Sequence, residues 1–108
     1  MAEQPPSYGV VLVTASSQTE AEAIAQSLLQ ARLAACISLF PMRSLYTWQG
    51  EVHNDQEWQL LIKTDLSQFS QLAAQIKAIH SYELPEIIAL PILTGSPDYL
   101  EWIGAQLK

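Results

Sequence analysis

The sequence predicts an α+β fold of the ferredoxin-like kind, with elements in the order β-α-β-β-α-β and one further helix at the C-terminus. Two observations lead to this prediction. Apolar residues recur at helical spacing in three segments, and runs of strand length rich in apolar residues separate them. Two β-α-β halves with right-handed crossovers place both helices on one face of a sheet. We therefore expect one domain over residues 1–108, beginning with a flexible tail at 1–7.

The first strand is predicted at 8–14, because this run is apolar and β-branched on successive residues, as in strands buried on both faces. Ser17 and Glu20 follow at the spacing of a capping box, so a helix is expected to begin there. The buried stripe of that helix is formed by Ala21, Ile24, Ala25, Leu28 and Leu29.

A long hairpin is expected in the middle of the chain. Its first strand is predicted at 33–40, with a break or bulge at Pro41, because proline has no N–H to donate to a β-ladder. Pairing resumes over 44–48. Gln49-Gly50 is expected to form a two-residue turn, with the glycine supplying a positive φ. The return strand then spans 51–64.

A second helix is expected after Asp65, whose side chain can cap its N-terminus. Its apolar positions are Leu66, Phe69, Leu72, Ala73, Ile76 and Ile79. A loop at 80–85 separates this helix from the next strand.

The last strand is predicted at 86–92, and Pro91 marks it as an edge strand or a bulge. Ser96 is expected to cap a final helix, with Pro97 at its first position. The apolar side of that helix carries Tyr99, Leu100, Ile103 and Leu107.

The predicted hairpin is too long for one compact subunit. Two strands of about 13 residues, at about 3.3 Å per residue, make a hairpin roughly 43 Å long. A domain of about 100 residues has a radius of gyration of only about 13 Å. Much of the hairpin should therefore project past its own helices, carrying Tyr46, Trp48 and Trp58. Because exposed strand edges with large aromatic side chains favour pairing with another chain, we expect copies of this chain to associate.

The composition argues against several classes of partner. The net charge is −6 with only five Lys and Arg, which form no cluster, so nucleic acids and anionic membranes are not expected as ligands. Hydrophobic residues make up 49% of the chain and charged residues 15%, which is more apolar than a small monomer easily hides. Residues 1–7 lack the pattern of a signal peptide, and Cys36 is the single cysteine. Together these features predict a cytoplasmic location.

Six short segments occur in an order typical of one family, and the similarity extends from about residue 9 to residue 107. They are ARLAAC at 31–36, SLYTWQGEV at 44–52, LIKT at 61–64, HSYELPEII at 80–88, LPI at 90–92 and DYLEW at 98–102. In this order they resemble the CutA family of divalent-cation tolerance proteins. The resemblance implies a ferredoxin-like homotrimer, similar in architecture to PII-type signalling proteins, in which long hairpins extend the sheets of neighbouring subunits. It also implies a role in tolerance to divalent metals, notably copper, with no enzymatic reaction attached.

A copper or zinc site requires several imidazole, thiolate or carboxylate donors that converge on the ion. The resemblance implies, for copper-binding relatives, a cysteine late in the first strand and two adjacent histidines at the end of the second helix. The matching positions here are Val13, Ile79 and His80, so one donor remains. The candidate metal site is therefore His80 with Glu83, Cys36 or groups from another subunit. The alternatives are a helix-terminal histidine stabilised by the helix dipole and a buried cysteine that acts as a small apolar side chain.

A second group of residues predicts a cleft for a small molecule. With a turn at Gln49-Gly50, Trp48 lies opposite Glu51 and Tyr46 opposite His53 on one face of the hairpin. Aromatic walls with a few charged groups are typical of ligand pockets. The alternative is a subunit interface packed with aromatic side chains and containing an ion pair. The candidate cleft residues are Tyr46, Trp48, Glu57, Lys63, Tyr82 and Glu86, and Glu57 and Lys63 would form the pair.

Signatures of enzymes are missing from the sequence, which has no glycine-rich phosphate loop, no G-x-S-x-G elbow and no H-E-x-x-H helix. We therefore expect no catalytic residue. Three hypotheses remain: a trimeric binding or signalling module that responds to divalent metal, a structural or adaptor trimer with incidental metal binding, and an enzyme acting on a small anion near Lys63 and Glu86.

Overall fold

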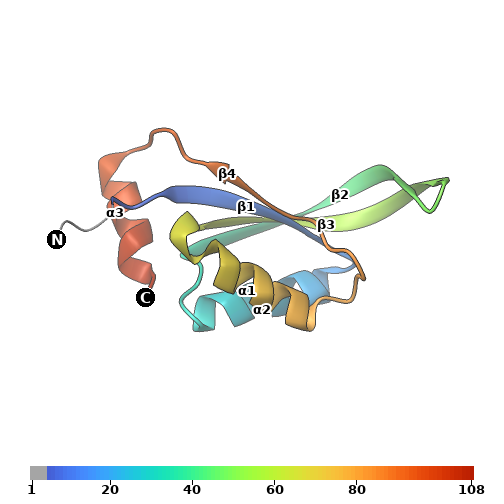
Figure 1. The fold of residues 1–108 in the computed structure, drawn as a ribbon, viewed down its shortest axis with the longest axis horizontal. Helices are drawn as coiled ribbons and strands as arrows, with labels where there is room; N and C mark the ends of the chain where they lie inside the picture. Colours follow the sequence, from blue (N-terminus) through green and yellow to red (C-terminus); the bar gives the residue numbers. More distant parts are fainter. Residues whose placement is uncertain (1–4) are drawn as a thin grey trace.

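The computed structural model describes residues 5–108 and shows a four-stranded antiparallel sheet in the order β2-β3-β1-β4. Helices α1 and α2 cover one face, and α3 stands at the end of the sheet away from the β2–β3 hairpin (Figure 1). The predicted ferredoxin-like fold is confirmed. The elements are β1 (Tyr8–Ala15), α1 (Gln18–Gln30), β2 (Cys36–Trp48), β3 (Glu51–Asp65), the 3₁₀ turn η1 (Leu66–Gln68), α2 (Phe69–Ile79), β4 (Ile87–Pro91) and α3 (Pro97–Gln106). Of the predicted tail, residues 1–4 lie outside the described residues and 5–7 have no regular structure.

The hydrophobic core lies between the sheet and helices α1 and α2. Alternate residues of β1 and β3 point into it, because side chains alternate across a strand, and the helices contribute residues at helical spacing. Its largest members are fully buried: Val11, Val13, Ile24, Leu28, Leu60, Ile62, Leu72 and Ile76. Three residues of the predicted helix stripes are exposed instead, one of them Tyr99 of α3. Leu29 follows Leu28 and is therefore turned about 100° away from it, and Ile79 is the last residue of α2.

The predicted break at Pro41 is wrong. The register of β2 against β3 runs without interruption from Cys36 opposite Lys63 to Trp48 opposite Glu51. Within residues 5–108, β2 has a neighbour on one side only, and an edge strand accommodates a residue that lacks an N–H. The strand also begins three residues later than predicted, because 33–35 form a buried connection that leads into it.

The predicted caps are formed in modified ways. The Oγ of Ser17 accepts a hydrogen bond from the N–H of Glu20 at 3.1 Å, as a capping box requires. The carboxylate of Glu20, however, accepts from the backbone N–H and hydroxyl of Ser16, at 2.9 and 2.8 Å. Asp65 caps the 3₁₀ turn η1, which precedes α2. Ser96 occupies the N-cap position of α3, but its side chain makes no capping hydrogen bond.

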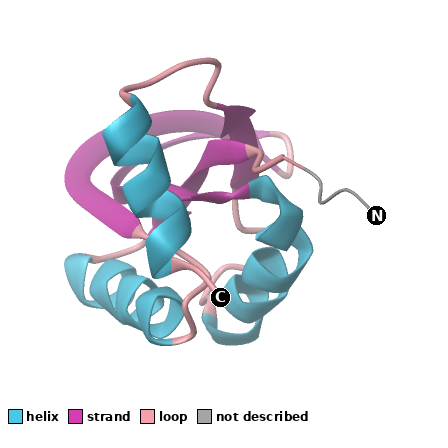
Figure 2. Ribbon diagram, turned by 90° about the vertical axis from the view of Figure 1, so that its left-hand side faces the viewer, coloured by secondary structure: helices cyan, strands magenta, loops and turns pink. Residues whose placement is uncertain are grey.

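A bare ribbon projects from the sheet. The pairing of β1 with β3 ends at Ala15 opposite Trp58, so residues 42–48 of β2 and 51–57 of β3 pair only with each other. Gln49 and Gly50 join them with φ values of 53° and 82°, which confirms the predicted two-residue turn. The molecule is consequently elongated, at 51 × 26 × 25 Å, and the strands curve strongly when viewed along its length (Figure 2).

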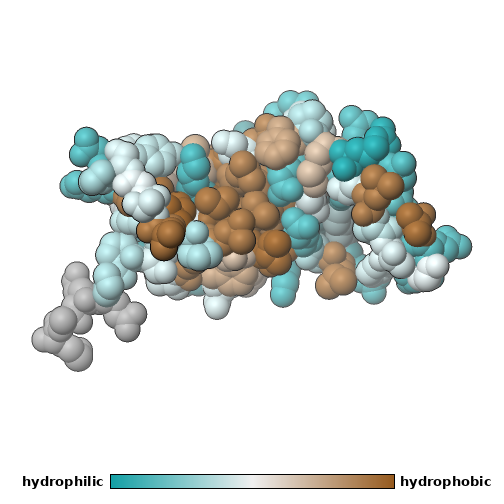
Figure 3. Space-filling model, turned by 90° about the horizontal axis from the view of Figure 1, so that it is seen from above, coloured by the Kyte–Doolittle hydropathy of each residue, from teal (hydrophilic) through white to brown (hydrophobic). Residues whose placement is uncertain are grey.

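The face of the sheet opposite α1 and α2 is largely apolar and open. Phe40, Ile88 and Leu90 lie on this open face and are exposed by 42%, 51% and 51%. Figure 3 shows hydrophobic atoms gathered across the middle of this face. At one end α3 packs through Ile103 against Tyr8, which leaves the remainder uncovered by the described residues.

We expect Leu60→Ala to lower the free energy of unfolding by about 2–5 kcal/mol, because it leaves a cavity under the centre of the sheet. Leu29→Ala, on the exposed side of α1, should change it by about 0.5 kcal/mol or less. Denaturant unfolding of both variants at one fixed protein concentration measures the difference. Equal effects would contradict the assignment of the core.

Candidate functional site

A cavity of about 720 Å³ lies between the distal ribbon and the 81–86 loop. Five of the six predicted cleft residues line it: Tyr46, Trp48, Glu57, Tyr82 and Glu86. Lys63 is the exception, because it lies toward the other end of the sheet. Its Nζ donates a hydrogen bond to the Tyr99 hydroxyl at 3.1 Å and stands 5.1 Å from the centre of that ring. The predicted Glu57–Lys63 ion pair is therefore not formed.

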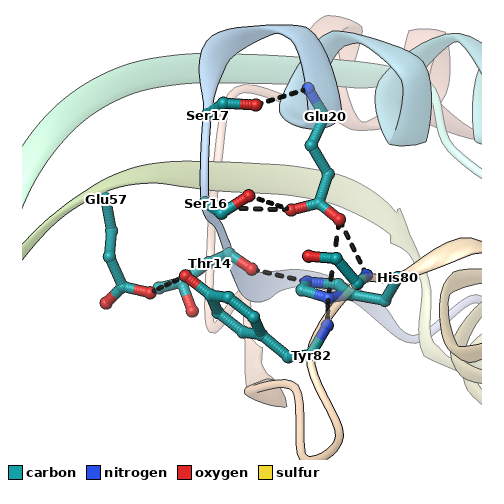
Figure 4. Close-up of polar contacts among 8 residues, drawn as sticks. Thr14, Ser16, Ser17, Glu20, Glu57, His80 and Tyr82 are labelled. Atoms are coloured by element: carbon teal, nitrogen blue, oxygen red, sulfur yellow. Dashed lines mark hydrogen bonds and ion pairs between the residues drawn. The ribbon is translucent and has the colours of Figure 1, made fainter.

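The loop that forms one wall of the cleft is anchored by a buried histidine at the end of α2 (Figure 4). The side chain of His80 has no exposed surface. Its Nδ1 accepts a hydrogen bond from the N–H of Tyr82 at 3.0 Å, so its Nε2 carries the proton and donates to the carbonyl of Thr14 at 2.7 Å. These two bonds tie the loop to the end of β1 and orient Tyr82 toward the sheet.

Glu20 is a second anchor for the same loop. Its Oε2 accepts a hydrogen bond from the N–H of Ser81 at 2.8 Å and lies 3.9 Å from Nδ1 of His80. Burial by itself would raise the pKa of Glu20, but hydrogen bonds from Ser16 and Ser81 outweigh it and lower this pKa to about 2. The carboxylate thus joins the start of α1 to a loop 61 residues away.

Glu57 connects this loop to the ribbon. The Tyr82 hydroxyl donates a hydrogen bond to Oε2 of Glu57 at 2.6 Å, and only 6% of Glu57 is exposed. Burial, and then the bond to Glu57, raise the pKa of Tyr82. The pKa of Glu86 is also raised, first by burial and then by the negative charge of Glu57. The cleft therefore concentrates negative charge.

The ribbon contributes the opposite wall. Tyr46 stacks on His53 with ring centres 5.4 Å apart, as expected from their opposed positions, and its hydroxyl donates to Asp55. Trp48 lies near the tip, opposite Glu51. Tyr46, Trp48 and Tyr82 thus give the cleft an aromatic lining.

Comparison with known proteins agrees with the fold. The sequence model described as CutA1 divalent ion tolerance protein matches residues 9–106. The chain belongs to this family. A divalent-cation tolerance protein CutA from Thermus thermophilus is 48% identical over 95 residues, which is 87% of this chain and 92% of the relative. One from Pectobacterium atrosepticum is 44% identical over 100 residues, covering 92% and 91%.

Solved CutA structures superpose closely on this chain. The protein from Archaeoglobus fulgidus has a TM-score of 0.92 at 37% identity and covers 94% of this chain and 99% of its own. The one from Thermus thermophilus has a TM-score of 0.91 at 45% identity, with the same coverage. The resemblance and the ferredoxin-like fold inferred from the sequence are thus both confirmed.

The cytoplasmic location predicted from the composition, residues 1–7 and the single cysteine is wrong. The Archaeoglobus fulgidus protein is called periplasmic and a relative from Arabidopsis thaliana chloroplastic, so CutA chains are not tied to the cytoplasm. A single unpaired cysteine is compatible with any of these compartments, because the chain has no disulfide whose formation would depend on the redox conditions. No helix within residues 5–108 has the length and apolar character needed to cross a membrane.

The candidate metal donors do not converge within one CutA chain. Both ring nitrogens of His80 are engaged and buried, and this residue does not line the cleft, whereas Glu83 does. Cys36 lies opposite Lys63, which is five residues along β3 from Trp58, where the bare ribbon begins. Cys36 is therefore roughly 17 Å along the sheet from the start of that ribbon. Residues 5–108 contain no cluster of three or more His, Cys, Asp or Glu that could hold a metal ion. The described residues of one subunit thus do not bring together the donors that a copper site requires.

The sequence did not predict the two groups that, with His80, anchor the loop. Thr14 contributes a backbone carbonyl, which any residue type would supply, and Glu20 was expected only to cap its own helix. Of the two positions at which the resemblance implied a metal donor that this chain lacks, Val13 lies in the buried core and Ile79 at the exposed end of α2.

We expect Glu20→Gln to make the fold less dependent on acid pH. Because the pKa of Glu20 in the folded protein, about 2, is below its ordinary value of 4.5, its stabilising effect is complete above about pH 4.5 and is lost as the pH falls toward 2. The variant should be less stable at neutral pH by about 1 kcal/mol, allowing for solvent screening, and should lose less stability on acidification. Thermal unfolding between pH 2 and pH 7 measures both effects.

Glu22→Gln is the matched control, because Glu22 is exposed on the same helix. An unchanged slope of stability against pH in Glu20→Gln, relative to this control, would show that the contacts of Glu20 do not stabilise the fold.

Proposed function

We propose that this CutA chain acts in divalent-cation tolerance as a homotrimeric binding or signalling module and not as an enzyme. The observation that carries the proposal is the bare ribbon of residues 42–57, which finds no further strand among residues 5–108 of its own chain. Its backbone groups and its exposed side chains, such as Leu45 and Val52, are available to a neighbour.

A ring of three copies gives the ribbon a strand to pair with and covers the apolar open face. A ribbon that pairs with a different part of the next copy makes a head-to-tail contact, and contacts of this kind form a ring when the rotation between copies closes. Three is the smallest such ring. The exposed Phe40, Ile88 and Leu90 of the open face would then be covered, because three sheets can pack their apolar faces around one axis. This arrangement is that of a PII-like trimer.

A copper-responsive site in this assembly would combine donors from neighbouring subunits. Cys36 and Glu83 lie on different parts of one chain, and neither belongs to a group of donors that could hold a metal among its described residues. Further donors would therefore have to come from a neighbouring subunit. The hypothesis of an enzyme acting on a small anion has no comparable support. Among the described residues that line the cleft, three are glutamates and none is lysine or arginine.

Native mass spectrometry at micromolar concentration should give about 36 kDa, three times the 12.0 kDa of one chain. We expect Ile88→Glu to weaken this assembly, because it places a charge on the open face. Leu29→Glu, on α1, should leave the mass unchanged. A particle of 12 kDa, or an Ile88→Glu variant that assembles normally, would contradict the proposed trimer.

Copper titration by calorimetry should show that Cys36→Ser weakens binding by about tenfold or more, whereas His80→Asn leaves the affinity within about twofold of the wild type. The physical reason is that both ring nitrogens of His80 are already hydrogen-bonded inside the fold. A large loss of copper affinity in His80→Asn, with the melting temperature maintained, would make His80 a metal ligand after all.

A further inference from the structure

The charged side chains of the cleft all carry the same sign. Glu57, Glu83 and Glu86 line the cavity, and no lysine, arginine or histidine among the described residues does so. The chain as a whole has a net charge of −6. A concave surface lined by one sign of charge concentrates ligands of the opposite sign. The cleft therefore favours a cation.

Glu57 has an acceptor that the fold does not use. Its Oε2 receives the hydrogen bond of Tyr82, but its Oε1 accepts none from residues 5–108, although the residue is more than nine-tenths buried. Figure 4 shows this second oxygen directed away from Tyr82. This oxygen is not sealed from solvent, and Glu57 lines the cavity, so Oε1 is available to a hydrogen-bond donor on a ligand in the cleft.

The walls and the volume of the cleft indicate which kind of cation it would bind. Tyr46, Trp48 and Tyr82 line it, and aromatic faces attract cations that lie within about 6 Å of the ring centre. The volume of about 720 Å³ is in the range of pockets that hold organic molecules. A bare divalent ion fits less well, because hard cations need about six oxygen ligands, and no three His, Cys, Asp or Glu side chains in residues 5–108, the glutamates of the cleft included, are placed to hold one ion together.

We propose that this cleft is a binding site for a small organic cation, in which an amine or guanidinium group pairs with Glu57 and an aromatic body lies between Tyr82 and the ribbon. All of the lining residues considered come from one chain, so the cleft does not require residues of a neighbouring subunit. The raised pKa of Glu86, caused by burial and by the charge of Glu57, is consistent with negative charge that no described protein group neutralises.

Three probes with one ring system and different charges test the proposal. Tryptamine carries a positive charge, tryptophol is neutral, and indole-3-acetate is negative. By calorimetric titration of the full chain, we expect tryptamine to bind about tenfold or more tightly than tryptophol, and indole-3-acetate to bind most weakly. Similar affinities for the three probes, or no binding of tryptamine at millimolar concentration, would overturn the proposal.

Variants of the cleft then locate the site. Glu57→Gln should reduce tryptamine affinity by about tenfold and leave tryptophol binding unchanged, because the glutamine can still accept the Tyr82 hydrogen bond. Glu51→Gln is the matched control: it removes the same charge from the same face of β3 but does not line the cleft. An equal loss in both variants would mean that net charge, not the cleft, attracts the amine.

Two further measurements distinguish organic-cation binding from a folding defect and from metal binding. Trp48→Ala removes an aromatic wall near the ribbon tip and should weaken tryptamine binding without lowering the melting temperature, so it remains informative if Glu57→Gln fails to fold. Magnesium chloride or copper chloride at millimolar concentration should not displace tryptamine. Displacement that Glu57→Gln abolishes would show a metal site in place of the organic-cation site.

Discussion

The mismatch in length between β1 and β3 is the constraint on which the rest of the structure depends. β1 ends opposite Trp58, so the first seven residues of β3, Glu51–Glu57, have only β2 beside them. A two-stranded ribbon is marginally stable by itself, and this one carries exposed apolar side chains at its tip. The same overhang leaves an edge for neighbouring copies and forms one wall of the cleft. The proposed assembly and the proposed ligand site are therefore two consequences of one feature.

The other wall depends on polar groups that are distant in sequence. His80 bonds to the end of β1, Glu20 bonds to the backbone that follows it, and Tyr82 reaches the ribbon at Glu57. A loop with so little apolar burial would otherwise be mobile. Because each of these bonds joins separate elements, the shape of the cleft reflects the packing of the whole sheet and not a local motif.

The donors of this chain differ from what the name of the CutA family leads one to expect. The family name concerns tolerance of divalent cations, yet His80, the donor predicted from the resemblance, uses both ring nitrogens to hold a loop. Metal response in this chain would consequently depend on donors that meet between subunits. The negative, aromatic cleft offers a separate chemistry, one suited to organic cations.

Local patterns in the sequence determined most of the fold. Apolar periodicity located every helix and strand to within about three residues, because burial of a stripe or a face is repeated along the chain, and the turn at Gln49-Gly50 followed from local backbone preference. The tertiary structure decided what Pro41, Lys63 and His80 do. Whether a proline breaks a strand depends on which side has a neighbour, and whether a charge or an imidazole is free depends on groups 36 or more residues away. Such pairings arise only when the sheet closes, so no local pattern can encode them.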